Sequence, residues 1–160
     1  MMRVSIVIPT LNEEKGIGHS IKAIPFGELR KAYDVEVVVV DGYSTDKTVD
    51  IAKSLGARIV MEKKRGYGRA YKTGFDAADG EMIVALDGDG TYPAKDIPAF
   101  LAKMEKEHLD FITTNRFAAM EPGAMSAMNK IGNAALTLTM NILFFISIKD
   151  SQSGMWAIRK

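Results

Sequence analysis

The chain of 160 residues has no cysteine and almost no excess of charge of either sign. Without cysteine no disulfide can form, and nothing in the sequence points to an oxidising compartment. The formal net charge is +1, from 21 basic and 20 acidic residues, which argues against nucleic acid as a partner. The amino terminus has neither the apolar length nor the cleavage pattern of a signal peptide. We therefore expect a cytoplasmic protein.

Internal repeats, low-complexity tracts and obvious linkers are also missing, so we expect one domain over residues 1–160. Hydrophobic residues make up 47% of the chain, enough for a domain of this size to bury a core. Apolar runs alternate with helical patterns, which predicts an α/β fold with a mostly parallel sheet sandwiched by helices. The predicted strands lie near residues 3–8, 35–40, 57–61, 81–86 and 110–114, and the clearest predicted helices span 67–78 and 94–107.

Two carboxylates follow the fourth predicted strand. The apolar run 82–85 leads into Leu86-Asp87-Gly88-Asp89-Gly90, a tight turn flanked by glycine. Carboxylates at i and i+2 suit Mg²⁺ or Mn²⁺, hard cations that keep some waters and share the oxygens of a nucleotide diphosphate. The alternative is an ordinary solvated turn, because turns favour Asp and Gly.

A second predicted strand also ends in an acid and a glycine. The run 35–40 terminates in Asp41 and Gly42, and the first strand runs into the polar segment 9–14. Ligands of open parallel sheets bind outside the carboxyl ends of the strands, so these ends predict one shared site. For Asp46 and Glu14 the favoured interpretation is helix capping, because each sits where a first helical turn favours negative charge.

Together these motifs resemble the family 2 glycosyltransferases, whose nucleotide-binding domain has the GT-A fold. The matching segments, in chain order, are Pro9-Thr10-Leu11-Asn12-Glu13-Glu14, residues 40–48, Arg65-Gly66-Tyr67-Gly68-Arg69-Ala70 with Gly74, and Asp87-Gly88-Asp89. The final segment, Asp150-Ser151-Gln152-Ser153-Gly154, resembles an element of the polyprenyl-phosphate hexose synthases, the dolichyl-phosphate mannose and glucose synthase branch. The resemblance covers nearly the whole chain.

The resemblance implies a nucleotide site built from several strand ends. Pro9 and Leu11 would shape the pocket wall, Glu13 would accept from the ribose or the base, and Asp41 would accept from the base edge. The basic segment 63–69, at a helix start, suits a diphosphate, although a short basic run is as often a solvated face. The nucleotide-binding residues are then Pro9, Leu11, Asn12, Glu13, Asp41, Ser44, Arg65, Asp87 and Gly88.

The implied reaction is a single displacement at the anomeric carbon, with inversion, in which the metal held by Asp87 and Asp89 activates the leaving group. A phosphate monoester acceptor, with a second pKa near ~6, is already anionic and needs no general base. A sugar hydroxyl needs a general base. Asp150, which lies in one of the matching motifs, is the favoured candidate, ahead of Asp110 and Glu121. The catalytic residues are thus Asp89, Asp150 and Arg116.

Arg116 follows the fifth predicted strand, in the position of the family's acceptor-phosphate arginine. Its planar fork suits phosphate, and a structural salt bridge is the alternative. Lys130 and Ser153 are the further candidates for the acceptor phosphate, with lysine standing where the family commonly has arginine. Another departure is Thr91, which stands where the mannose synthases commonly carry glutamine after the metal motif.

Residues 131–148 carry no charge. We interpret them as a helix lying in a membrane interface rather than a span, because a span would separate residues 150–154 from the other motifs. The lipid-facing residues would be Leu136, Met140, Leu143, Phe144 and Phe145. Packing against the sheet and a homodimer face are the alternatives.

The sequence therefore predicts a glycosyltransferase that moves a hexose from a nucleotide-diphospho sugar, UDP-glucose or GDP-mannose, to a polyprenyl phosphate at the membrane face. Two alternatives stay open: transfer to a glycan hydroxyl, and a non-catalytic module that binds sugar nucleotides or docks on membranes. Family members usually continue beyond the Ser-Gly element, so truncation at the carboxyl end is part of the interpretation.

Overall fold

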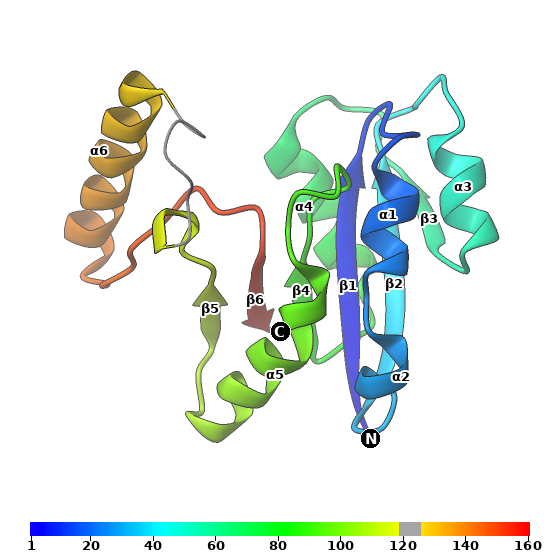
Figure 1. Cartoon of the computed structure of the whole chain (residues 1–160), viewed down its shortest axis with the longest axis horizontal. Helices are drawn as coiled ribbons and strands as arrows, with labels where there is room; N and C mark the ends of the chain where they lie inside the picture. The colour runs from blue at the N-terminus through cyan, green and yellow to red at the C-terminus, as the bar shows by residue number, and fades with distance from the viewer. Residues whose placement is uncertain (119–125) are drawn as a thin grey trace.

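The computed structural model describes residues 1–118 and 126–160, which build a six-stranded sheet in the order β3-β2-β1-β4-β6-β5 (Figure 1). The strands are β1 (Met2–Thr10), β2 (Tyr33–Asp41), β3 (Arg58–Met61), β4 (Met82–Ala85), β5 (Phe111–Thr113) and β6 (Trp156–Arg159). β1 pairs in parallel with β2 and with β4, and β2 pairs in parallel with β3. β6 runs antiparallel to both β4 and β5. The predicted mostly parallel sheet is confirmed.

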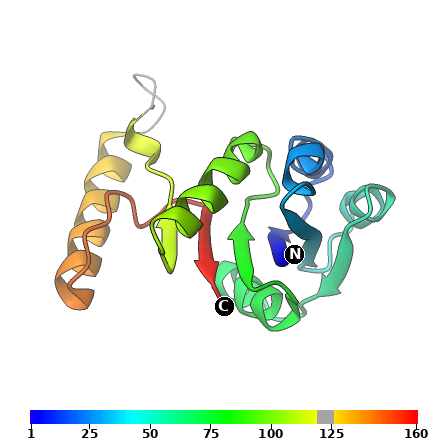
Figure 2. The same ribbon diagram turned by 90° about the horizontal axis from the view of Figure 1, so that it is seen from below.

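Helices cover both faces of this sheet (Figure 2). The helices are α1 (Ile17–Lys22), α2 (Phe26–Leu29), α3 (Thr48–Ser54), α4 (Tyr67–Ala77), α5 (Ile97–Lys106) and α6 (Ala127–Phe144), with short 3₁₀ turns at Ala94–Asp96 and Arg116–Ala118. Helices α1, α2 and α5 share one hydrophobic cluster with the sheet, and α4 packs on the opposite face.

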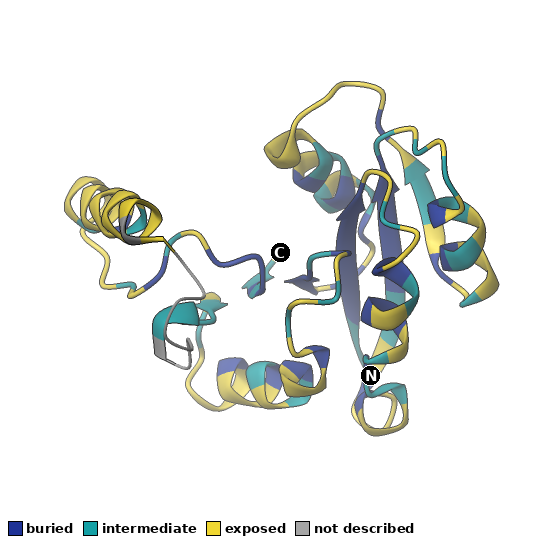
Figure 3. Ribbon diagram, turned by 45° about the horizontal axis from the view of Figure 1, so that its top comes forward, coloured by how far each residue is buried: buried dark blue, intermediate teal, exposed yellow. Residues whose placement is uncertain are grey.

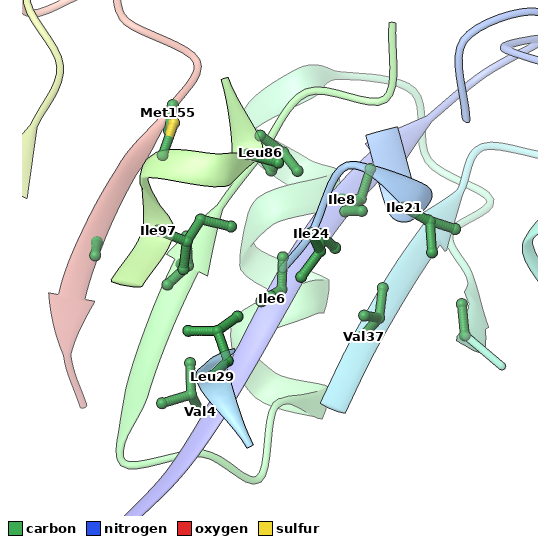
Figure 4. Close-up of a cluster of buried hydrophobic side chains, with 14 of the residues drawn as sticks. Val4, Ile6, Ile8, Ile21, Ile24, Leu29, Val37, Leu86, Ile97 and Met155 are labelled. Atoms are coloured by element: carbon green, nitrogen blue, oxygen red, sulfur yellow. The ribbon is translucent and has the colours of Figure 1, made fainter. Parts of the chain in front are cut away.

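Strand β1 lies at the centre and is buried on both faces. Val4, Ile6 and Ile8 belong to the larger cluster, beneath α1, α2 and α5 (Figure 4), whereas Val7 belongs to the cluster under α4. Alternate side chains of a strand point to opposite faces, so a near-continuous apolar run is what a strand covered on both sides requires.

Helix α4 approaches the sheet closely at Gly74. A Cβ on Gly74 would overlap Cγ1 of Val7 and lie 3.1 Å from Cγ2 of Val40. Glycine therefore lets the helix backbone sit directly on the valines of β1 and β2. This packing fixes the first turn of α4 beside the carboxyl ends of the parallel strands.

Helix α6 stands away from the sheet (Figure 1), and its surface is almost wholly exposed (Figure 3). Thr137 is the one buried residue among its described side chains. The hydroxyls of Thr137 and Ser151 lie 3.0 Å apart, and Asn141 makes two hydrogen bonds to the backbone of Ile148.

The structure does not support the interpretation that residues 131–148 pack against the sheet. Leu136, Met140, Leu143, Phe144 and Phe145 are all exposed, and Phe145 is 96% exposed. Within residues 1–118 and 126–160, none of the helices combines the length and the hydropathy that crossing a bilayer demands.

Candidate functional site

A cavity of about 390 Å³ opens where β1, β2 and β4 end and α4 begins. This volume is in the range of small-molecule sites. Of the nine residues predicted to bind the nucleotide, six line it: Pro9, Leu11, Glu13, Arg65, Asp87 and Gly88. Asp89 lines it as well, and the rest of the lining is Thr10, Gly42, Glu62, Lys64, Gly66, Tyr67 and Ala70.

One wall of the cavity is acidic. Burial, and after it the nearby carboxylate of Asp89, raise the pKa of Glu13 above its ordinary value. The pKa of Asp87 is also raised, first by burial and then by Asp89, against hydrogen bonds that lower it. Because the charge of Asp89 raises the pKa of both Glu13 and Asp87, this wall holds negative charge that a bound cation would relieve.

A second wall, formed by the segment before α4, carries two basic side chains beside Glu62. Lys64, Arg65 and Gly66 line the cavity just before the first turn of α4, where backbone N–H groups and the helix dipole favour an anion. Glu62 shapes this segment, because its carboxylate accepts hydrogen bonds from the Lys64 backbone and from the side chains of Arg69 and Thr73. Nε of Arg69 lies 3.1 Å from Oε2 of Glu62, so the guanidinium is paired with this carboxylate.

Three predicted nucleotide residues, Asn12, Asp41 and Ser44, do not line the cavity. They connect the loops after β1 and β2 instead. The fully buried carboxylate of Asp41 accepts from the Ser44 backbone at 2.7 Å and from the hydroxyls of Ser44 and Thr10. The Asn12 side chain accepts from the Thr45 backbone at 2.9 Å. This network holds Gly42 and Leu11 at the cavity edge.

Asp46 and Glu14 behave as the capping interpretation predicts. An Asp46 carboxylate oxygen accepts from the backbone N–H of Thr48, the first residue of α3, at 3.0 Å. Glu14 accepts from the backbone of Lys47 at 3.2 Å. Both carboxylates therefore satisfy backbone donors that the start of α3 leaves free.

Arg116 and Asp150 form a bidentate ion pair at the edge of the sheet where the cavity opens. Nε and Nη2 of Arg116 donate to the two oxygens of Asp150 at 2.7 and 2.8 Å, and the backbone of Arg116 donates to it as well. The Asp150 side chain is fully buried and that of Arg116 is 26% exposed. Although burial opposes it, hydrogen bonds from Arg116 hold the pKa of Asp150 below its usual value.

These contacts disfavour the predicted role of Asp150 as a general base, and that role stays a prediction. Its oxygens also accept from the Gln152 backbone, so the carboxylate is committed to its partners and resists protonation. Asp110 precedes β5, which runs in the same direction as β4, and it lies at the opposite edge of the sheet from Asp87. Glu121 lies outside the described residues.

The two further candidates for the acceptor phosphate do not line the cavity. Ser153 is buried, and its hydroxyl contacts Thr114 and the backbone of Met155 between β5 and β6. Lys130 is exposed on α6. Arg116 does not line the cavity either, but its charge acts on Asp87 and lowers the pKa of that carboxyl, against the burial that raises it.

The donor set fits a hard divalent cation. Asp87 and Asp89 offer oxygen ligands, and one oxygen of Asp89 is fixed by the backbone and hydroxyl of Thr91 at 2.9 and 2.8 Å. Across the described residues no group of three or more His, Cys, Asp or Glu gathers as a closed ligand set. Mg²⁺ or Mn²⁺ would therefore take its other ligands from a diphosphate and water.

Sequence reasoning gave no role to three tyrosines beside the acidic wall. Tyr67 lines the cavity and donates a hydrogen bond to Asp87, with Tyr71 behind it. Tyr92 accepts from the backbone of Gly154 at 2.7 Å and lies beside Arg116. The i, i+4 spacing of Tyr67 and Tyr71 placed both hydroxyls on one helix face, and this signal was available in the sequence.

The family model for glycosyl transferase family 2 matches residues 5–160. The chain belongs to glycosyl transferase family 2. A dolichyl-phosphate hexose transferase of Haloferax volcanii is 33% identical to it over 159 residues, which are 98% of this chain and 66% of the relative. A low-salt glycan biosynthesis hexosyltransferase of the same organism is 34% identical over 154 residues, 95% of this chain and 37% of the relative. The chain thus spans only part of the length of these family members.

The solved structure of glucosyl-3-phosphoglycerate synthase from Mycobacterium tuberculosis, in complex with Mn²⁺ and uridine-diphosphate-glucose, has the same fold. It matches with a TM-score of 0.74 at 23% identity, over 99% of this chain and 56% of its own. The predicted GT-A fold is therefore confirmed.

Proposed function

We propose that this family 2 domain transfers a hexose, with inversion, from a nucleotide-diphospho sugar to a polyprenyl phosphate. The observation that carries the proposal is the charge pattern of the cavity. Glu13, Asp87 and Asp89 lie on one wall, and Lys64 and Arg65 lie on the other, at the start of α4. A nucleoside diphosphate with a divalent cation would match this pattern, because Lys64 and Arg65 would bind its phosphates and the carboxylates would hold the cation.

Each side chain has a defined task in this reaction. Lys64, Arg65 and the first backbone N–H groups of α4 would bind the diphosphate, and Pro9 and Leu11 would border the nucleoside. Asp87 and Asp89 would hold Mg²⁺ or Mn²⁺. The bound cation supplies charge neutralisation for the departing nucleoside diphosphate. UDP-glucose and GDP-mannose are the donors to test.

The Arg116–Asp150 pair supports a phosphate acceptor. Asp150 takes one side of the guanidinium and fixes its plane, and the remaining N–H groups of Arg116 are directed elsewhere. A fixed guanidinium binds phosphate in a forked geometry that a mobile one does not. The same contacts deprive a sugar hydroxyl of Asp150 as its base, which disfavours transfer to a glycan. The name of the dolichyl-phosphate hexose transferase among the relatives agrees with this acceptor.

Helix α6 supports an acceptor in a membrane. It exposes Leu136, Leu143 and Phe144 together with Phe145 at its end, and Lys130 and Lys149 flank its apolar part. An apolar helix flanked by cations suits the interface of an anionic bilayer, where a polyprenyl chain would also lie. We therefore place the protein at the membrane face, in contact through residues 131–148. A second copy of the chain is the alternative occupant of this surface.

A panel of acceptors tests the proposal. The protein is incubated with Mn²⁺ and labelled UDP-glucose or GDP-mannose, and with a polyprenyl phosphate, the matching polyprenol or a soluble oligosaccharide. We expect product only with the polyprenyl phosphate. Product on the polyprenol or the oligosaccharide would show that a hydroxyl is the acceptor. Nucleotide binding without any product would identify a non-catalytic module.

A further inference from the structure

Two tyrosines of α4 form a chain of hydroxyl groups that ends on Asp87. The hydroxyl of Tyr67 donates to Oδ1 of Asp87, and the hydroxyl of Tyr71 lies 3.1 Å from that of Tyr67. Tyr71 is also 3.5 Å from the same carboxylate oxygen. Because Tyr67 has one hydrogen and directs it to Asp87, its own oxygen is left to accept from Tyr71.

The surroundings hold this chain in place. The rings of Tyr67 and Tyr71 meet edge to face with centroids 4.9 Å apart. Tyr71 is buried, and its ring also packs against Phe75 and against Trp156 of β6, at 5.9 and 5.3 Å. Aromatic contacts of this kind fix ring orientation as well as burying area. The hydroxyl that supports Tyr67 is therefore anchored in the core.

Gly154 confines the Asp87 carboxylate on another side. A Cβ on Gly154 would overlap Oδ2 of Asp87. Gly154 is itself held by the hydrogen bond from its backbone N–H to Tyr92. The carboxylate thus lies between the tyrosine hydroxyls, which contact one oxygen, and the backbone of the segment before β6, which contacts the other.

We propose that Tyr67 is a positioning residue that orients the Asp87 carboxylate for the divalent cation. The inference rests on the proposed function, since it assigns a residue to the same metal site. A carboxylate oxygen has two acceptor positions, so the hydroxyl occupies one of them and leaves the other for a cation. Hydrogen bonds to a ligating carboxylate fix its rotamer, and losing them typically costs 10–100-fold in metal affinity.

A purely structural role for Tyr67 agrees less well with its location. The residue is 58% exposed and lines the cavity, so it buries little area of its own. It also joins the two walls, because the basic segment 63–66 runs directly into it while its hydroxyl contacts the acidic wall. The first turn of α4 is thereby tied to Asp87 as well as directed at the diphosphate.

The test is to remove the Tyr67 hydroxyl alone, with a matched control. Tyr67→Phe keeps the ring and the helix. Tyr33→Phe is the matched control. Tyr33 is the first residue of β2, and its hydroxyl contacts another carboxylate, that of Glu105, at 3.0 Å. UDP and GDP are titrated into each protein by calorimetry, without metal and at a series of Mn²⁺ concentrations.

We expect Tyr67→Phe to raise the Mn²⁺ concentration needed for half-maximal enhancement of nucleotide binding by about tenfold or more, with nucleotide affinity in the absence of metal unchanged. Tyr33→Phe should leave both quantities at the wild-type values. An unchanged Mn²⁺ requirement in Tyr67→Phe would overturn the inference alone, and a lower requirement would show that the hydroxyl competes with the cation. Wild-type protein without any Mn²⁺ effect would overturn the proposed function and the inference together.

Discussion

Asp150 is a buried carboxylate that orients the guanidinium of Arg116. Its folded-state pKa lies below the ordinary value, so the stability it contributes is present above the unfolded pKa and is lost as the pH falls through the folded pKa. Arg116 depends on this charge for its orientation. The pair therefore links the stability of the site to the protonation of one residue.

Asp150→Asn should lower the free energy of unfolding at pH 7 by about 3 kcal/mol, because it leaves the guanidinium without its buried partner. The deficit should begin to shrink as the pH falls below about 4, the ordinary pKa of Asp in an unfolded chain, and should shrink further as the pH falls through the lower folded-state pKa. Urea unfolding across this pH range measures both effects, with Asp110→Asn, on the exposed Asp110, as the control. A deficit that stays constant with pH would contradict the assignment.

Arg116→Lys separates the shape of the cation from its charge. Lysine keeps a positive charge beside Asp150 but loses the planar fork. We expect the rate of transfer to a polyprenyl phosphate to fall by about 100-fold, while the affinity for the nucleotide stays the same. Steady-state transfer assays and calorimetry give the two numbers. An equal loss of nucleotide affinity would place Arg116 in the donor site instead.

At the residue scale, the sequence correctly located several side chains that line the cavity. Asp87, Asp89 and Arg65 reach the cavity because strand ends and a helix start bring them to one edge. Asp41 and Ser44 sit at equally suitable positions in the sequence, but they turn inward and bond to each other. Which way a loop carboxylate turns depends on partners from another loop, such as Thr10 and Asn12, and the motif alone does not reveal them.

At the scale of elements, alanine substitutions at two glycines of α4 should change the stability of the protein in opposite directions. Gly74→Ala should destabilise the protein by about 2 kcal/mol, because the new methyl group overlaps the stiff side chain of Val7. Gly68→Ala, on the same helix with no atom within 4 Å of its Cβ, should stabilise it by about 0.5–1 kcal/mol. Thermal and urea unfolding of the two variants test the packing, and effects of the same sign would contradict it.

Helix α6 gives the second prediction at this scale. Leu143 and Phe144 are 64% and 60% exposed, so replacing both with glutamate should change the free energy of unfolding by no more than about 0.5 kcal/mol per site. The amount of protein that sediments with vesicles of phosphatidylcholine and phosphatidylglycerol should nevertheless fall by about tenfold or more, because two apolar side chains no longer enter the interface.

Ser54→Glu, on the exposed end of α3, adds negative charge away from α6 and should not affect vesicle binding. Size-exclusion chromatography of the same proteins tests the alternative occupant. Loss of a dimer in the glutamate variant, without any vesicle binding by the wild type, would assign the surface to a second copy of the chain.

The elements themselves were largely predictable. Residues 3–8, 35–40 and 81–86 are apolar runs of strand length, and each is a strand of the sheet. The helix pattern over residues 94–107 was also right, although its first turn, Ala94–Asp96, is 3₁₀. The environment of α6 was not predictable, because a helix with no charge after Lys130 suits a core, a membrane interface and a dimer face equally well.

At the scale of the whole molecule, the site follows from the order of the strands. β1 lies between β2 and β4, so the polar ends of three parallel strands meet at one edge, where α4 also begins. The antiparallel β6 then brings Asp150 and Gly154 to this edge from the far end of the sequence. Alternating strands and helices predict a parallel sheet, but they do not specify that a late strand inserts beside β4.

We propose that the acidic and basic walls together bind a nucleoside diphosphate with a divalent cation. Calorimetric titration with UDP and with GDP, each with and without Mn²⁺, tests it on wild type and on Asp89→Asn. This substitution keeps an oxygen that can accept from Thr91 and relieves repulsion with Glu13 and Asp87, so the nucleotide-free protein should unfold at an equal or slightly higher temperature.

We predict that wild type binds one of the two nucleotides in a manner that depends on Mn²⁺, and that Asp89→Asn loses this dependence while staying folded. Binding of neither nucleotide, or equal binding with and without the metal, would contradict the account.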